Sequence, residues 1–391
     1  MRIALVCSEV IRESGHGRYM QELARRLASE HEVHVYAHLF QPIPGVTHHP
    51  VPAPLGLNLL RVFGFYLAST AVLGREPYDV VHTIGGCTWR HDVVTAQFCQ
   101  RPWGAHLARQ PLPPAKGRFG WLSTRLRRLY HELYWRVCDW LEAPAFRPRP
   151  GKKLIAVSGR VRDELSCYYG ADADEVAVIY NGVEPAEFSE EALAPLRAPT
   201  RAELGIGEDE RVLLFVGDFY RKGLATVIEA LPLLKTPRIR LLIVGRGEEA
   251  AFHARAHALG VDFQLIFTGF QPDVVPYFAA ADAFVFPTRY EPFGMVVTEA
   301  MAAGLPVVTT RQAGAAEVIT EGGDGYLIDD PDDARAIAGR IDALFEDDDR
   351  RVAMGRAARK TAARYDWNYV AHETLAVYAR TGSASTTSRA I

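Results

Sequence analysis

The chain has 391 residues, of which 48% are hydrophobic and 23% charged, with a formal net charge of −3 at pH 7. These values describe an ordinary globular protein of a length at which two domains are the usual arrangement. The negative charge argues against nucleic acid as the main partner. Five scattered cysteines without a CxxC pair indicate neither a disulfide framework nor a zinc site, and they fit a reducing cytoplasm.

The N-terminus reads as structure rather than as a targeting signal. Its apolar run, RIALV, is too short for a signal peptide and is typical of a buried first strand. The longest apolar stretch, residues 62–74, is well under the ~20 residues that a membrane span needs. We therefore predict a buried helix there, no membrane crossing and a cytoplasmic protein.

Strand and helix patterns alternate through the first half of the chain. A loop with two glycines is expected at 9–17, followed by an amphipathic helix at 18–30. Continuous apolar runs predict strands at 2–8, 31–39, 78–86, 91–99 and 153–159. Such repeated units predict a doubly wound parallel sheet with right-handed crossovers.

A second set of alternating elements follows in the C-terminal half. Apolar runs predict strands at 211–219, 239–247, 263–270, 282–288 and 305–310. The fold class is therefore α/β, with two Rossmann-like doubly wound domains that face a central cleft. Ligands of open α/β sheets bind at the carboxyl ends of the strands, so the loops there are the place to look for a site.

Composition also predicts the domain boundaries. Residues 1–188 form the N-terminal domain, and 189–210, rich in Ala, Pro and charge, are interpreted as the linker. Residues 211–365 form the C-terminal domain, and a helix at about 366–380 is expected to pack back on the N-terminal domain. The Ser/Thr-rich tail, 381–391, has no core-forming residues and is predicted to be disordered.

Arg221 and Lys222 follow a predicted strand and precede Gly223 and a helix. Two adjacent cations at the start of a helix favour an anion, because Arg offers a bidentate fork and Lys a mobile point charge. The alternative is a solvated pair on a loop. Gly15 and Gly17 would let backbone approach a ligand, but they lack the third glycine of GxGxxG, and a plain tight turn is equally compatible.

Two carboxylates flank the start of another predicted helix, from Gly294 to Ala303. Glu291 lies in the loop before it and Glu299 lies within it, eight residues later. At ~100° per residue both can face one ligand, on the order of 10 Å apart. Hydroxyl groups suit the carboxylates, and phosphate suits the amides at the helix start. The alternative is dipole complementation by Glu291 and a surface salt bridge by Glu299.

These motifs resemble one known family. The segment EPFGMVVTEAMAAGLPVV is similar to the E-x7-E signature of retaining GT-B glycosyltransferases of family 4. The segments VGDFYRKG, VIYNGVE, AAADAFVFPT and GAAEVI are also similar to the family's motifs. The resemblance covers most of the chain, is most specific in the C-terminal half, and is nearest to the branch of the lipopolysaccharide core glucosyltransferases.

The resemblance implies a role for each matching residue. Arg221 and Lys222 would hold a nucleotide diphosphate and stabilise the leaving group as charge develops. Glu291 would bind hydroxyls of the donor sugar, and Glu299 the ribose. Further donor-binding positions are implied at Gly15, Gly17, Phe270, Phe293, Gly294 and Met295. Such enzymes use a nucleotide-diphosphate sugar, here a UDP-sugar by preference, without a metal or other cofactor.

Gln97 departs from the family pattern. The family segment similar to DVVTAQFCQ carries His or Asp near the reactive carbon, and Gln97 stands at that position. Gln can hydrogen-bond a sugar hydroxyl but cannot act as a base. Because the family's transfer is driven largely by the leaving phosphate, we still predict Gln97 to be a catalytic residue, together with Arg221, Lys222 and Glu291. His91 and Asp92 could supply a base, but we interpret them as ordinary strand-edge residues.

A basic segment indicates a membrane surface as a further partner. Between Arg101 and Lys153, Lys and Arg exceed Asp and Glu by nine, and residues 117–142 interleave Arg with Trp and Leu. A basic amphipathic helix of this kind is typical of attachment to anionic membranes, at the inner face of the cell membrane for a cytoplasmic protein. The alternative is a core-facing helix with solvated arginines. Membrane attachment would fit a lipid-linked or cell-envelope acceptor.

Other functions stay open on the same fold. A nucleotide-sugar epimerase and a phosphorylase are alternatives, although no lysine for pyridoxal phosphate is evident and E-x7-E favours transfer. A degenerate protein that only binds nucleotide-sugar is supported by Gln97 and opposed by the intact Arg221, Lys222, Glu291 and Glu299 set. An NAD dehydrogenase is disfavoured by the incomplete glycine fingerprint.

Overall fold

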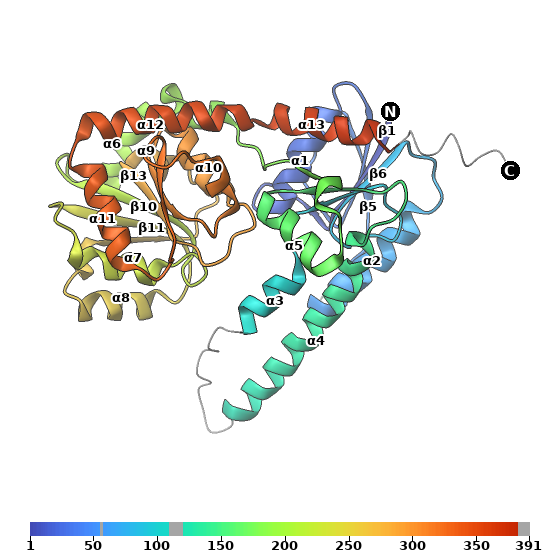
Figure 1. Cartoon of the computed structure of the whole chain (residues 1–391), viewed down its shortest axis with the longest axis horizontal. Coiled ribbons are helices and arrows are strands. Elements are labelled where there is room, and N and C mark those ends of the chain that lie inside the picture. The colour runs from blue at the N-terminus through green and yellow to red at the C-terminus, as the bar shows by residue number, and fades with distance from the viewer. Residues whose placement is uncertain (55–57, 109–119, 382–391) are drawn as a thin grey trace. The chain divides into compact units, whose positions relative to one another are not determined.

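The computed structural model describes residues 1–54, 58–108 and 120–381 (Figure 1). The chain divides into two compact units. Unit 1 comprises Met1–Tyr180 and Val370–Ile391, and unit 2 comprises Asn181–Tyr369. The tail predicted at 381–391 lies, except for Thr381, outside the described residues.

Unit 1 is built on a seven-stranded parallel sheet in the order β5-β3-β1-β6-β7-β8-β9. Its strands are β1 (Arg2–Val6), β3 (Glu32–Ala37), β5 (Val46–Pro50), β6 (Val80–Ile84), β7 (Val93–Ala96), β8 (Lys153–Ala156) and β9 (Val176–Val178). The central strands β6 and β7 are wholly buried, as expected for strands covered on both faces, and their polar side chains, His82, Thr83 and Thr95, are buried with them. A small parallel pair, β2 (Glu9–Val10) and β4 (Leu39–Phe40), lies outside this sheet.

The helices of unit 1 are α1 (Gly15–Leu27), α2 (Asn58–Leu73), α3 (Gln100–Ala108), α4 (Gly120–Phe146) and α5 (Gly159–Tyr169). The last helix, α13 (Trp367–Ala379), belongs to unit 1 from Val370 onward. Its Tyr378 hydroxyl lies 2.6 Å from Nδ1 of His82 on β6. Burial lowers the pKa of His82 to about 3, so this contact joins two neutral groups.

Unit 2 is built on a six-stranded parallel sheet in the order β12-β11-β10-β13-β14-β15. Its strands are β10 (Arg211–Asp218), β11 (Ile239–Arg246), β12 (Leu265–Gly269), β13 (Ala283–Phe286), β14 (Val307–Thr310) and β15 (Gly325–Ile328). Its helices are α6 (Glu190–Glu203), α7 (Leu224–Ala230), α8 (Glu249–Ala258), α9 (Val275–Ala280), α10 (Met295–Ala302), α11 (Ala334–Phe345) and α12 (Asp348–Ala362). The predicted α/β class with two doubly wound sheets is confirmed.

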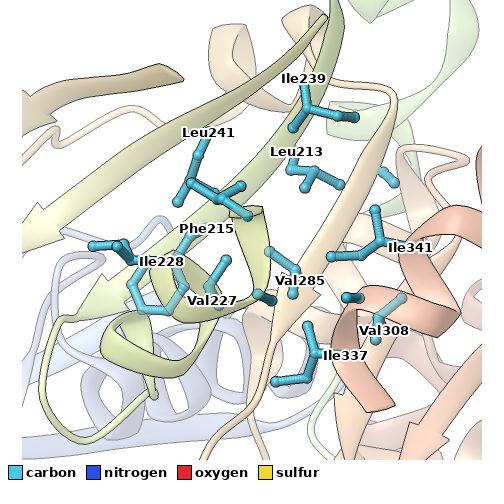
Figure 2. Close-up of a cluster of buried hydrophobic side chains, with 14 of the residues drawn as sticks. Leu213, Phe215, Val227, Ile228, Ile239, Leu241, Val285, Val308, Ile337 and Ile341 are labelled. Carbon is cyan, nitrogen blue, oxygen red and sulfur yellow. The ribbon is translucent and has the colours of Figure 1, made fainter. Parts of the chain in front are cut away.

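The core of unit 2 lies between one face of this sheet and the helices α7, α8 and α11. Figure 2 shows its centre, where Leu213, Phe215 and Leu241 of the strands meet Val227 and Ile337 of the helices. All five side chains are fully buried. This apolar layer fixes the strands, and the strands in turn fix the loops at their carboxyl ends.

Residues 189–210 are not the linker that composition predicted. Glu190–Glu203 within this stretch form α6, which belongs to unit 2 despite Pro195 and Pro199 within it. Ser189 caps the helix by accepting a hydrogen bond from the Ala192 amide. Arg197 and Arg201 anchor it by pairing with Asp282 and with carbonyl oxygens at the end of α9. Long-range anchoring therefore outweighs the local signal of proline.

The helix predicted as buried at 62–74 is only half buried. It forms α2, which packs beside α4 (Figure 1) and leaves one apolar face uncovered. Leu60, Phe63 and Leu67, spaced at helical intervals along α2, are 53%, 37% and 52% exposed. An uncovered apolar stripe on a helix is the mark of a contact surface rather than of a core element.

Candidate active site

The site is built where the sheet of unit 2 changes its direction of winding. β10 and β13 are neighbours in the sheet although β11 and β12 separate them in the sequence. The loops that follow them are therefore adjacent, and the backbone oxygen of Arg221 accepts hydrogen bonds from the Thr288 hydroxyl and the Arg289 amide. Ligands of open α/β sheets bind at such a switch point.

Gly223 allows the two loops to come this close. Its φ of +82° is a left-handed conformation, and an added Cβ would lie 2.2 Å from the carbonyl oxygen of Pro287. Any side chain at this position would push the loop of Arg221 and Lys222 away from the loop of Glu291. Gly223, which the sequence places before a helix, thus also permits the close approach of the two loops of the site.

Lys222 and Glu291 form an ion pair between the two loops. Their side chains are only 9% and 12% exposed, so the pair is largely withdrawn from water. Burial and the neighbouring Arg221 cation lower the pKa of Lys222 well below its usual range. The Asp218 carboxylate opposes this by favouring the ammonium form. The ring of Phe286, centred 4.9 Å from Nζ, adds a cation–π contact.

The start of α10 is shaped around Glu291. The amide of Glu291 donates to the Gln312 carbonyl, and its own carbonyl accepts from Gly314, so its backbone is held on both sides. Gly294, at φ +96°, is the N-cap, and a Cβ there would come within 3.0 Å of the Glu291 side chain. The helix begins at Met295, one residue later than predicted, and its first amides have no partner within the helix.

Glu299 lies inside α10, where it is 6% exposed. Phe293 is buried as well, so only its backbone is in a position to serve a ligand. The structure therefore brings Arg221, Lys222 and Glu291 together in one set of loops, with Glu299 on the helix that follows.

An aromatic platform lies farther along the same edge of the sheet. Phe270, just after β12, is 47% exposed, and the guanidinium of Arg246 at the end of β11 lies 3.8 Å from its ring centre. The sequence singled out Phe270 but not Arg246. The signal that could have found Arg246 is its position, because it ends a buried strand that neighbours the strand leading to Arg221.

The remaining predicted residues belong to unit 1. Gln97 follows the carboxyl end of β7, whereas His91 and Asp92 precede β7 at its amino end. His91 is neutral, since burial lowers its pKa to about 4, and Asp92 accepts a hydrogen bond from the Val81 amide. Neither can replace a base at the position of Gln97.

The glycines of the predicted loop 9–17 have another role. Helix α1 already begins at Gly15, so the last three residues of the predicted loop lie in the helix's first turn. A Cβ on Gly17 would lie within 2.9 Å of the carbonyl oxygens of Glu9 and Ile11. The close approach at Gly17 is therefore to the chain's own backbone.

Among residues 1–54, 58–108 and 120–381, no cluster of three His, Cys, Asp or Glu side chains could hold a metal ion. Within the same ranges, no helix is both long enough and apolar enough to cross a membrane.

The fold is that of the GT-B glycosyltransferases. WaaG, a glycosyltransferase involved in lipopolysaccharide biosynthesis, superposes with a TM-score of 0.78 at 24% identity, over 96% of this chain and 99% of WaaG. HepE of Anabaena in complex with UDP-glucose gives a TM-score of 0.68 at 21% identity, over 97% of this chain and 99% of HepE.

The chain belongs to the family described as Glycosyl transferases group 1, which matches residues 197–361, while Glycosyltransferase Family 4 matches residues 14–187. An uncharacterized glycosyltransferase of Methanocaldococcus jannaschii is 28% identical over 313 residues, or 78% of this chain and 76% of the relative. These matches support glycosyl transfer over the epimerase and phosphorylase alternatives.

Proposed function

We propose that this chain is a retaining glycosyltransferase that moves a sugar from a nucleotide-diphosphate sugar to an acceptor hydroxyl. The observation that carries the proposal is the buried Lys222–Glu291 pair beside Arg221 at the switch point of unit 2. An anion-binding group and a hydroxyl-binding group are adjacent there, as a sugar diphosphate requires.

The ion pair suggests how the donor is received. The diphosphate draws Lys222 and Arg221 to its oxygens, which releases the Glu291 carboxylate to accept hydrogen bonds from the sugar hydroxyls. Glu299 binds the ribose from within α10, and the first amides of α10 contact the diphosphate. Phe270 and Arg246 provide a face on which the nucleotide base stacks.

The transfer step follows from this placement. The bond between the anomeric carbon and the phosphate oxygen breaks, and its electron pair goes to the departing diphosphate. Arg221 and Lys222 stabilise the charge that develops there. The acceptor oxygen bonds to the anomeric carbon on the same face, and its proton passes to the departing phosphate. Gln97 hydrogen-bonds a hydroxyl near that carbon and takes no proton.

The donor is a UDP-sugar by preference, and no metal is required, since Arg221 and Lys222 carry the positive charge that a metal would otherwise supply. The complex of HepE with UDP-glucose favours uridine among the nucleotides. The involvement of WaaG in lipopolysaccharide biosynthesis favours a cell-envelope glycan as acceptor, which would place the protein at the inner face of the membrane.

The test is donor binding and donor turnover with a panel of nucleotide-sugars in EDTA. We expect a UDP-sugar to raise the melting temperature of the wild type, because a ligand of the native state stabilises by mass action. Glu291→Gln should abolish release of UDP, and Glu249→Gln, an exposed glutamate on α8, should not. Unchanged turnover by Glu291→Gln would refute the assignment.

A protein that only binds nucleotide-sugar is the second candidate, favoured by Gln97 in place of a charged residue. It predicts the same melting shift with no release of UDP from any donor. Release of UDP by the wild type would exclude it.

We also propose that unit 1 attaches to an anionic membrane surface, where a lipid-linked acceptor would be found. The support is the apolar stripe of α2 together with Leu133 and Trp140 on α4, which are 50% and 64% exposed. Phe63 and Trp140 lie 6.4 Å apart between ring centres, so the stripes of both helices join. Arginines in the sequence of α4 supply charge that complements anionic headgroups.

Flotation with vesicles tests this attachment. We expect the wild type to float with phosphatidylcholine–phosphatidylglycerol vesicles more than with phosphatidylcholine alone. The double variant Leu67→Ser, Trp140→Ser should lose flotation, and Phe263→Ser, which alters a side chain 69% exposed on unit 2, should keep it. Equal flotation of all three proteins would contradict the proposal.

A further inference from the structure

Unit 1 contains a partly open cavity of 260 Å³ at the carboxyl ends of β1, β6 and β7. The chain changes winding direction there too, because β6 lies beside β1 on the side away from β3. The polar residues of the lining include Ser8, His16, Gln97, Tyr134 and Glu142. Pockets for drug-sized ligands measure roughly 300–1,000 Å³. This smaller cavity therefore suits one saturated ring rather than a nucleotide.

Glu142 reaches the cavity because two glycines admit helix α4 to the end of β6. A Cβ on Gly86 would lie 2.4 Å from the carbonyl oxygen of Leu141, so α4 could not approach a larger residue. Gly85, at φ +53°, faces the carboxyl group itself, since its Cβ would lie 3.7 Å from Oε1 of Glu142. The pair Gly85–Gly86 thus fixes the position of this carboxyl group over the sheet.

The two oxygens of Glu142 differ in their surroundings. Oε2 accepts hydrogen bonds from the Gln100 amide at 2.8 Å, the first of α3, and from the Tyr169 hydroxyl at 2.7 Å. Oε1 has no hydrogen bond to any residue that the structure describes. The residue is 5% exposed, so a buried carboxyl group lines a cavity with one oxygen held and the other available.

Resting on the glycosyltransferase function proposed above, we propose that this cavity binds a hydroxyl-rich ring of the acceptor and that Glu142 holds one of its hydroxyl groups through Oε1. Gln97, which also lines the cavity, hydrogen-bonds a second hydroxyl group of the ring. The ligand class is a sugar or a cyclitol, because a ring with several hydroxyl groups matches both the size of the cavity and these two partners.

The protonation of Glu142 makes the binding depend on pH. Burial raises its pKa to about 8, with a further increase from Asp139 and opposing effects from the Gln100 amide, Tyr169 and Arg101. Other titratable groups beside it are Cys87, Cys99 and Cys138, which stay protonated because burial raises their pKa. The carboxylate accepts a hydroxyl more strongly than the neutral acid does, so a polyol binds better above pH 8.

The experiment measures polyol binding to the full chain by saturation-transfer NMR, with UDP present, from pH 6.5 to 9.5. D-glucose, D-galactose, D-mannose and myo-inositol serve as probes. We expect at least one probe to bind the wild type, about three- to tenfold more tightly above pH 8 than at pH 7. A ligand that prefers the carboxylate lowers the pKa of Glu142, and a shift of up to one unit corresponds to a change of up to about tenfold in affinity. Glu142→Gln should bind without this pH dependence, and Glu142→Ala should not bind.

Tyr169→Phe is the matched control, because it alters the same packing but leaves the carboxyl group in place. It should keep binding, with the pH transition moved upward, since a hydrogen bond to the charged form is lost. Absence of binding by every probe would overturn the inference, as would the same pH dependence in Glu142→Gln. If Glu142→Ala does not fold, Glu142→Gln decides. The melting shift with UDP-sugar, measured separately, shows whether the proposed function itself fails.

Discussion

Replacing Lys222 by methionine should separate the structural and chemical roles of the ion pair. The change leaves Glu291 as a buried carboxylate without its partner, and loss of one member of a buried pair costs about 3–5 kcal/mol. Both side chains keep about a tenth of their exposure, which favours the lower end, about 3 kcal/mol. For a unit of this size each kcal/mol lowers the melting temperature by roughly 2–4 °C, so a fall of about 6–12 °C is expected.

The double variant Lys222→Met, Glu291→Gln should recover most of this loss, because no charge is then left unpaired. Neither variant should release UDP from a donor. Calorimetry at pH 7 and pH 5 measures how the loss of stability depends on pH. The single variant should lose less stability at pH 5, where the unpaired carboxyl group takes up a proton more readily. A double variant as unstable as Lys222→Met would refute the reasoning.

Three other substitutions test further features. Gly223→Ala should lower the free energy of unfolding by about 1–2 kcal/mol from backbone strain alone. It should also weaken donor binding in a melting-shift titration, because its Cβ meets the Pro287 carbonyl and displaces the loop of Arg221 and Lys222; unchanged affinity would contradict this. The folded-state pKa of Glu142, about 8, lies above the usual value of a carboxyl group, so its stabilisation is complete at low pH and lost as pH rises through 8. Urea denaturation should therefore show stability falling from pH 5 to pH 9 by more in the wild type than in Glu142→Gln, and equal slopes would argue against it. Tyr378→Phe should cost about 1 kcal/mol in the same assay by removing the hydrogen bond to His82, and no loss would show that this bond is not stabilising.

The strands and the loops proposed to bind the donor could be predicted from local sequence. Buried parallel strands are continuous apolar runs, so β1, β6, β10 and β13 were visible, and the polar residues after the last two were visible as loop residues. Strand β5 was missed because VTHHP combines histidines with a proline and is only partly buried. It exists by pairing with β3, a contact that local pattern cannot express.

The features that sequence missed depend on contacts between distant segments. Nothing around Glu142 marks it, because its environment is made by Gly85, Gln100 and Tyr169. Likewise, α6 appeared to be a linker because its anchoring partner, Asp282, lies some eighty residues away. The exposure of α2 could not be read from its composition, since an apolar helix looks the same whether or not another element covers it.

The return of the chain to unit 1 at Val370 sets the order in which the two units can be finished. Unit 2 is a continuous stretch and has all its strands once Tyr369 has been made. Unit 1 begins first on the ribosome, yet Tyr378 reaches His82 from 296 residues further along the chain. Domains generally fold as units during synthesis. The surface of the N-terminal sheet that α13 covers therefore stays uncovered during synthesis. Unit 1 is completed only when the rest of the protein has been translated.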